Sequence, residues 1–101
     1  MFGFRSGEVM KSKKRFLGLT SALETAIRYG NPSGYAQMVD TAAELRNILR
    51  NEELDLTRGE KVRVVKSITR AKVKAFMDGT ADSYRTFKTL DTISNDLVQL
   101  L

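Results

Sequence analysis

The residues best suited to chemistry in this chain are four cations within the segment 57–79 (TRGEKVRVVKSITRAKVKAFMDG). At about 100° per residue, Arg63, Lys66, Arg70 and Lys74 fall within one arc of a helix. The opposite arc is apolar and comprises Val64, Ile68, Ala71 and Ala75, extended by Val65 and Phe76. A row of cations that faces water suits phosphate groups, because each neutralised phosphate releases counterions. We therefore expect a helix that buries one side and presents the other to nucleic acid.

A second basic cluster, Lys11, Lys13, Lys14 and Arg15, lies nearer the N-terminus and is a candidate second contact with nucleic acid. Cations in the first turns of a helix are disfavoured by the macrodipole, so the cluster has no evident local stabilising role. The alternative is a solvated stretch ahead of a helix that begins near Arg15. Reading base edges requires Asn, Gln or Arg. Because the row on 57–79 offers only its two arginines, we expect weak or nonspecific recognition that does not distinguish DNA from RNA.

The overall charge agrees with a polyanion partner but does not require one. Seventeen Lys and Arg stand against twelve Asp and Glu in 101 residues, for a formal net charge of +5. Such a bias attracts nucleic acid. A solvated helix face is the simpler explanation of any row of charges.

Catalytic and metal-binding residue types are scarce. The chain has no histidine and no cysteine, which excludes the usual nucleophile and base arrangements and the common zinc sites. The acidic stretch 51–56 (NEELDL) has too few oxygen ligands for a calcium loop, and no glycine pattern forms a phosphate-binding loop. We predict no enzymatic activity, no metal and no cofactor. An enzyme built from Arg, Lys, Glu and Gln is the alternative, and Lys72 is its most unusual residue because it projects on the apolar side.

The hydrophobic spacing predicts an all-α fold: a small four-helix bundle-like single domain with short loops. Residues 1–7 are expected to form a flexible N-terminal arm, since two glycines interrupt them, and residues 8–101 the helical domain. The first helix should run from near Glu8 or Ser12 to Tyr29. Gly30-Asn31-Pro32 should form the turn into an antiparallel second helix that ends near Arg50.

The third and fourth helices carry clearer boundary signals. Thr57 and Glu60 have the spacing of a capping box, and Gly79 suits the left-handed end of the third helix. Thr80 should cap a fourth helix that runs to the C-terminus. Lys72 is expected either at the edge of the core or in contact with a partner.

No stretch is apolar enough for a membrane span, and no signal peptide is evident, so we expect a cytoplasmic protein without membrane contact. The second class of function is a helical protein–protein interaction module, such as an adaptor, an inhibitor or a subunit of a homo-oligomer. The hairpin around Asn31-Pro32-Ser33-Gly34-Tyr35 resembles the central hairpin of the small terminase subunits of tailed phages, which are ring-forming DNA-packaging proteins. The resemblance covers about a third of the chain and assigns no functional residue.

Overall fold

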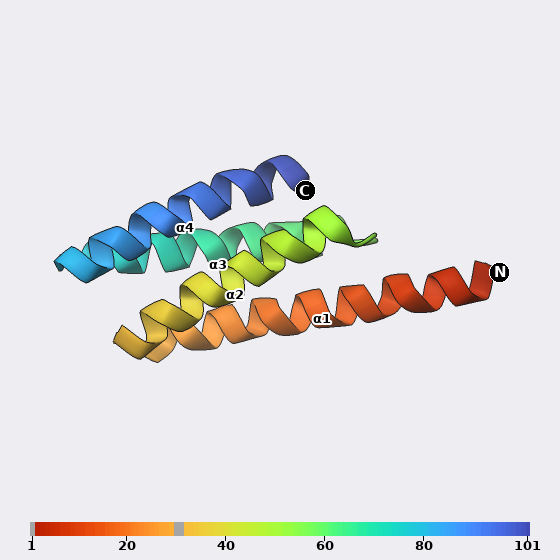
Figure 1. Cartoon of the computed structure of the whole chain (residues 1–101), viewed down its shortest axis with the longest axis horizontal. Coiled ribbons are helices and arrows are strands. Elements are labelled where there is room, and N and C mark those ends of the chain that lie inside the picture. The colour runs from red at the N-terminus through yellow and green to blue at the C-terminus, as the bar shows by residue number, and fades with distance from the viewer. Residues whose placement is uncertain (1, 30–31) are drawn as a thin grey trace.

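The computed structural model describes residues 2–29 and 32–101, and it confirms the predicted all-α, bundle-like fold (Figure 1). In chain order the helices are α1 (Phe2–Tyr29), α2 (Pro32–Asn51), α3 (Arg58–Met77) and α4 (Ala81–Leu100). Side chains are described from Gly7 to Tyr29 and from Gly34 onward. The predicted turn residues Gly30 and Asn31, and the side chains of the predicted N-terminal arm up to Ser6, lie outside that part.

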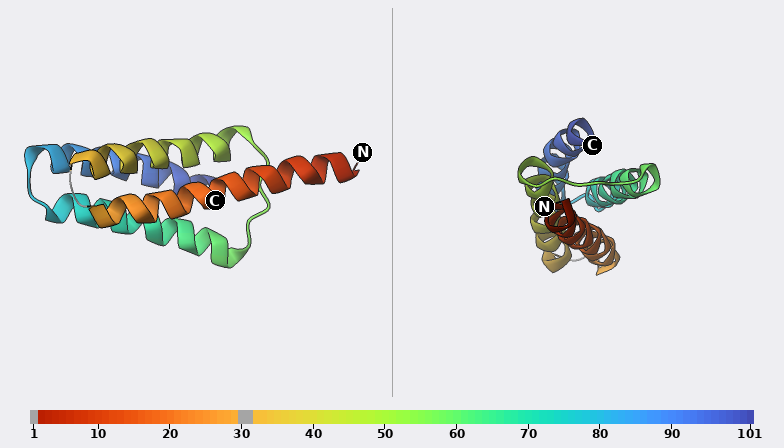
Figure 2. Two further views of the ribbon diagram at one scale, coloured as in Figure 1. Left: turned by 90° about the horizontal axis from the view of Figure 1, so that it is seen from below. Right: turned by 90° about the vertical axis from the view of Figure 1, so that its right-hand side faces the viewer.

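The helices form two antiparallel hairpins, α1 with α2 and α3 with α4, packed against each other (Figure 1). The connection 52–57 crosses the end of the bundle from α2 to the diagonally opposite α3 (Figure 2). As a result α1 lies beside α3 and α2 lies beside α4. Because successive helices alternate in direction, α1 and α3 are parallel neighbours.

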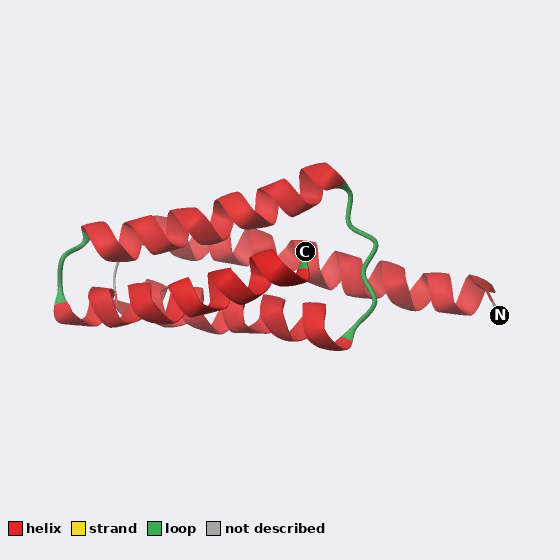
Figure 3. Cartoon of the chain, turned by 90° about the horizontal axis from the view of Figure 1, so that it is seen from above, coloured by secondary structure: helices red, strands yellow, loops and turns green. Residues whose placement is uncertain are grey.

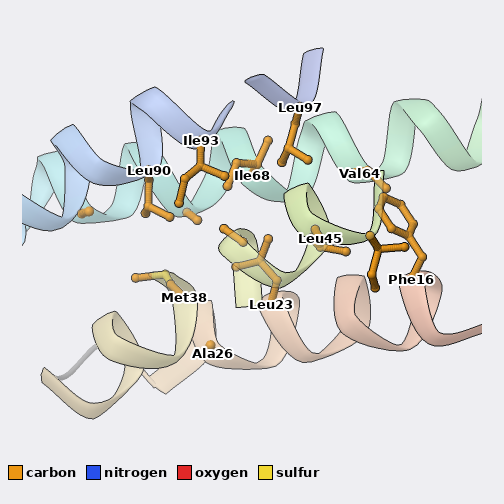
Figure 4. Close-up of a cluster of buried hydrophobic side chains, with 14 residues drawn as sticks. Phe16, Leu23, Ala26, Met38, Leu45, Val64, Ile68, Leu90, Ile93 and Leu97 are labelled. Carbon is orange, nitrogen blue, oxygen red and sulfur yellow. The ribbon is translucent and has the colours of Figure 1, made fainter. Parts of the chain in front are cut away.

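The core lies where the two hairpins meet and draws on all four helices (Figure 4). The predicted inward positions Val64, Ile68, Ala71 and Ala75 of α3 are buried, together with residues such as Phe16 on α1 and Leu45 on α2. The loop 52–57 contributes Leu54 and Leu56, which pack against this core. The prediction that Phe76 joins the buried side of α3 is wrong, because its side chain is 58% exposed at the outer edge of the bundle.

The predicted helix boundaries of the second hairpin are confirmed. The Thr57 amide donates to Glu60 Oε1 at 2.8 Å, and the Glu60 amide donates to Thr57 Oγ1 at 3.2 Å. Thr80 caps α4 in the same reciprocal way with Ser83. Gly79 has φ of 70°, so the turn between α3 and α4 uses the left-handed conformation that glycine adopts without a Cβ penalty.

The start of α1 differs from its prediction. The helix begins at Phe2 rather than near Glu8 or Ser12, so residues 2–7 of the predicted arm have helical backbone. Once a helix exists, each further residue adds a hydrogen bond, and single glycines cost only about 1 kcal/mol each. The first part of α1 extends beyond the end of the other helices (Figure 3). The predicted flexibility of this segment stays a prediction.

Candidate nucleic-acid interface

The predicted basic row of α3 lies on the side of that helix that borders α1. Arg63, Lys66, Ser67 and Arg70 line a shallow depression of about 270 Å³ together with Glu24 of α1. The opposite side of α3 holds Val64, Ile68, Ala71 and Ala75, which are all buried. The helix therefore has the predicted division into a buried side and a positive side. The four cations, however, are not equivalent.

Arg63 is held by α1. Its Nη2 atom donates to Glu24 Oε1 and to Ser21 Oγ, each at 2.8 Å, and its Nε atom donates to Glu24 Oε2 at 3.4 Å. The buried Ser67 donates its hydroxyl to the same carboxylate at 2.9 Å. The Arg63 hydrogen bonds are the main cause that lowers the pKa of Glu24, and Glu24 in turn raises the pKa of Arg63. Arg63 is thus exposed, as the predicted row requires, but its guanidinium is already paired with a carboxylate of the same chain.

Lys74 is also close to a carboxylate. Its Nζ atom lies 3.8 Å from Asp78 Oδ1, one turn along the chain, and its side chain is only 29% exposed. Asp78 also accepts a hydrogen bond from the Tyr35 hydroxyl at the start of α2. That hydrogen bond is the main cause that raises the pKa of Tyr35 to about 12. Lys74 thus belongs to a polar contact between the α3–α4 turn and α2, which weakens its candidacy as a phosphate ligand.

Lys66 and Arg70 remain as the exposed cations of the row. Within the described part of the chain, neither side chain has a hydrogen bond or a salt bridge. Arg70 adds only a weaker electrostatic effect that lowers the pKa of Glu24. These two residues are the members of the predicted row that are open to an external phosphate.

The basic cluster of α1 is divided in the same way. Lys13 Nζ lies 3.1 Å from Glu60 of α3. Arg15 pairs with Glu52 at 3.1 Å and with Glu44 of α2 at 3.3 Å. Glu52 of the acidic stretch 51–56 therefore neutralises a cation of α1. Lys11 and Lys14 are exposed, and among the described residues they form no ion pair.

Arg28 is a candidate that the sequence analysis missed. Lys14, Ser21 and Arg28 are seven residues apart, which places them on the same side of α1. Because Ser21 contacts Arg63, this side borders α3. Arg28 is exposed and has no salt bridge to any described residue. The seven-residue spacing was the available signal, but without the neighbouring helix it did not indicate which side of α1 mattered.

Lys72 lies on the other side of α3, toward α4. Its Nζ atom is 2.9 Å from Asp91 Oδ1, and its side chain is 22% exposed. Lys72 therefore lies at the edge of the core, which is one of the two positions expected from the sequence.

The charges of whole helices explain why one side of the bundle is basic. Helix α3 has seven Lys or Arg and one Glu, a net charge of +6, and α1 has six against two, a net charge of +4. Helix α2 has two of each sign, and α4 has two against three, a net charge of −1. Because α1 and α3 are parallel neighbours, most of the excess positive charge lies on adjacent helices (Figure 2).

Among residues 2–29 and 32–101, no three His, Cys, Asp or Glu side chains gather where they could hold a metal ion. No described helix has the length and apolarity to cross a membrane. No family model, curated protein or solved structure matches the chain. The likeness of the 31–35 hairpin to small terminase subunits thus rests on the sequence alone.

Proposed function

We propose that this protein binds nucleic acid electrostatically through the face formed by α1 and α3. The observation that carries the proposal is the position of the +4 and +6 helices as parallel neighbours. Charges spread along two adjacent helices act together on a polyanion, since the fields of neighbouring cations add over the surface. The role is binding rather than catalysis, in keeping with a chain that has neither histidine nor cysteine.

The exposed cations are the phosphate ligands in this proposal. Lys66 and Arg70 contribute from α3, and Lys14 and Arg28 from the adjoining side of α1. Lys66 and Arg70 line a shallow depression rather than a deep cleft, which suits backbone phosphates. Arg63 serves mainly to join the two helices, because its guanidinium is already engaged by Glu24. We expect binding to be strongly salt-dependent and largely independent of sequence.

A double substitution with a matched control tests this function. Lys66→Gln with Arg70→Gln removes two exposed cations from the proposed face. Arg85→Gln with Lys88→Gln removes the same charge from exposed positions on α4, a helix that does not adjoin α1. Affinity for a DNA duplex, an RNA duplex and single strands of equal length is measured by fluorescence anisotropy at several salt concentrations.

The first variant should bind more weakly. Its slope of log affinity against log salt concentration should become shallower by roughly 1.8 on duplex DNA, about 0.9 for each lost phosphate contact. The control should retain the parental slope. Equal slopes for the two variants, or no salt-dependent binding by the parent, would end the proposal. The second candidate, a protein-interaction module, would then be favoured by the exposed apolar side chains on α3 and α4.

A further inference from the structure

The exposed side of α3 carries cations and large apolar side chains together. Lys66 and Val73 are seven residues apart, as are Arg70 and Met77, so each apolar side chain lies on the same side of the helix as a cation. Val73 is 54% exposed and Met77 is 74% exposed. Nearer the start of α3, Val62 lines the basic depression with Lys66 and Arg70. These apolar side chains therefore belong to the surface that holds two of the proposed phosphate ligands.

A row of three-residue steps leads from this surface to α4. Arg70, Val73 and Phe76 follow one another at that spacing, and each step turns about 60° around a helix of 3.6 residues per turn. The row starts near α1, where Arg70 lines the depression with Glu24, and ends at α4, where the Phe76 ring contacts the Phe87 ring. At 1.5 Å per residue, Arg70 and Phe76 are about 9 Å apart along the helix axis. One flexible polymer can therefore contact both the cation and the ring.

Phe76 is exposed but held in place. Its side chain is 58% exposed, and its ring meets the Phe87 ring edge to face with centroids 5.2 Å apart. Phe87 is partly buried and packs against the core, so it supports the exposed ring. An edge-to-face contact leaves at least one face of the Phe76 ring free of Phe87. The nearby Tyr84 ring is less open, because Lys88 Nζ lies over it, 5.4 Å from its centroid. Phe76 is therefore the ring best placed to accept another planar group.

The carboxylates around these rings are compensated within the chain. Three lie within four residues of Phe76, Tyr84 or Phe87 in sequence: Asp78, Asp82 and Asp91. Each forms a salt bridge, at 3.8, 2.8 and 2.9 Å, with, in turn, Lys74, Arg85 and Lys72. Lys66 and Arg70 have no such partner among the described residues. The charge left uncompensated beside the rings is therefore positive, which favours an anionic occupant.

We propose that the nucleic acid bound here is single-stranded, which presupposes the function proposed above. An unpaired base stacks on Phe76, and adjoining phosphates contact Lys66 and Arg70. Single strands are bound by basic surfaces that carry exposed aromatic rings, because every base has a π face. In a duplex those faces are stacked on one another, so Phe76 and its apolar neighbours would gain no contact.

The combination of groups favours a single strand over a protein. A contiguous group of exposed apolar side chains indicates an interaction site, which a protein could also fill. A protein surface laid over Phe76 and Val73 would need carboxylates placed for Lys66 and Arg70 as well, since covering a cation without a counter-charge is costly. Every nucleotide of a single strand supplies both groups that the surface requires, one phosphate and one base.

Tryptophan fluorescence of the full chain tests the stacked base directly. The chain has no tryptophan, so Phe76→Trp introduces a single reporter at the exposed ring position. An oligothymidylate should quench its fluorescence through stacking, and a DNA duplex of equal length should quench it far less. Leu100→Trp is the matched control. Leu100 is four residues from Asp96, which pairs with Arg46 and Arg50 of α2, so it lies on the far side of α4 and should respond to neither probe.

Phe76→Leu separates the ring from the cations. Leucine keeps an apolar side chain at this exposed position but has no π face. Affinity for oligothymidylate, measured by fluorescence anisotropy of a labelled strand, should fall by at least about fivefold, the lower limit for one lost stacked base. The salt slope should stay at the parental value because no cation has changed. Affinity for the duplex should not fall. An oligouridylate titrated in parallel shows whether RNA is bound in the same way.

Several results would overturn the single-strand proposal while the electrostatic function stands. They are a Phe76→Leu variant that binds oligothymidylate as the parent does, one that loses strand and duplex binding equally, and a Phe76→Trp variant that binds the strand without quenching. A parent that binds neither probe would end both proposals. If circular dichroism shows that Phe76→Leu does not fold, the quenching of Phe76→Trp against Leu100→Trp decides the question.

Discussion

Glu24→Gln is expected to have two opposite effects: lower stability and tighter binding of nucleic acid. The Glu24 carboxylate accepts hydrogen bonds from Arg63 and from the buried Ser67, and so joins α1 to α3. Glutamine keeps the size of the side chain but removes the negative charge. The substitution therefore weakens a helix–helix contact and leaves Arg63 without its anion at the edge of the proposed binding face.

The size of the stability loss follows from the exposure of the partners. The Arg63 and Glu24 side chains are 43% and 32% exposed, so their ion pair contributes in the range of surface pairs, about 0.5 to 1 kcal/mol. Weakening the Ser67 hydrogen bond adds about 0.5 kcal/mol. A total of roughly 1 to 1.5 kcal/mol corresponds to a melting temperature about 4 to 10 °C lower for a domain of this size. On the binding side, one freed cation should steepen the salt slope by about 0.9.

Lowering the pH should remove the stabilising effect of the same contact. Because the pKa of Glu24 is lowered in the folded state, the stabilising effect of its charge is present above the ordinary value of 4.5 and is lost as pH falls through the lowered value. The difference in free energy of unfolding between the parent and Glu24→Gln should therefore shrink below about pH 4.5.

Urea denaturation between pH 3 and pH 7 measures this difference, and anisotropy titrations on duplex DNA at several salt concentrations measure the slope. Glu44→Gln is the control, since it removes an equal charge from an Arg15 pair on the α2 side, where Glu52 still holds the arginine. A Glu24→Gln variant that loses stability but keeps the parental slope would show that Arg63 takes no part in binding. Unchanged stability would contradict the role of the contact itself.

Two further substitutions test local contacts. Tyr35→Phe removes the hydrogen bond to Asp78. Because the pKa of Tyr35 is raised to about 12, the stabilising effect of this hydrogen bond in the parent should be full below about pH 10 and lost as pH rises toward 12. The free energies of unfolding of parent and variant should differ by about 0.5 kcal/mol at pH 8 and converge at high pH, and a constant difference would refute this. Gly79→Ala should cost about 1 kcal/mol in urea denaturation through its left-handed φ alone, because the nearest atom to an added Cβ, the Met77 carbonyl oxygen, is 3.9 Å away. Gly59→Ala, in the first turn of α3 with ordinary space around it, serves as the comparison and should not destabilise.

The parts of the fold that the sequence predicted are those determined within a few residues. Thr57 and Glu60 cap α3 through atoms three residues apart, and Gly79 sets the end of the helix through its own backbone. Burial of Val64 and Ile68 follows from helical spacing alone. Phe76 shows the limit of this reasoning, since its position on α3 is at the edge of the apolar side, and only the place of α4 decides whether it is covered.

The candidate site depended on contacts that no local pattern contains. Arg63 and Glu24 are 39 residues apart in sequence, and Lys72 and Asp91 are joined across two helices. The spacing on α3 identified the row of four cations, but it could not show that Arg63 and Lys74 have carboxylates beside them. Which cations stay open is decided by which helices are neighbours.

The diagonal connection 52–57 settles that question. In a bundle whose helices followed one another around a ring, α1 and α3 would lie on opposite corners, and the neutral α2 and weakly acidic α4 would separate their charges. Crossing the diagonal instead brings the +4 and +6 helices together at an electrostatic cost. Two of the three acidic residues of α1 and α3 offset this cost where the two helices meet. Glu24 pairs with Arg63, and Glu60 pairs with Lys13. Because each carboxylate neutralises a cation between the helices, the positive charge that remains unpaired lies on the outer surface, where a polyanion can reach it.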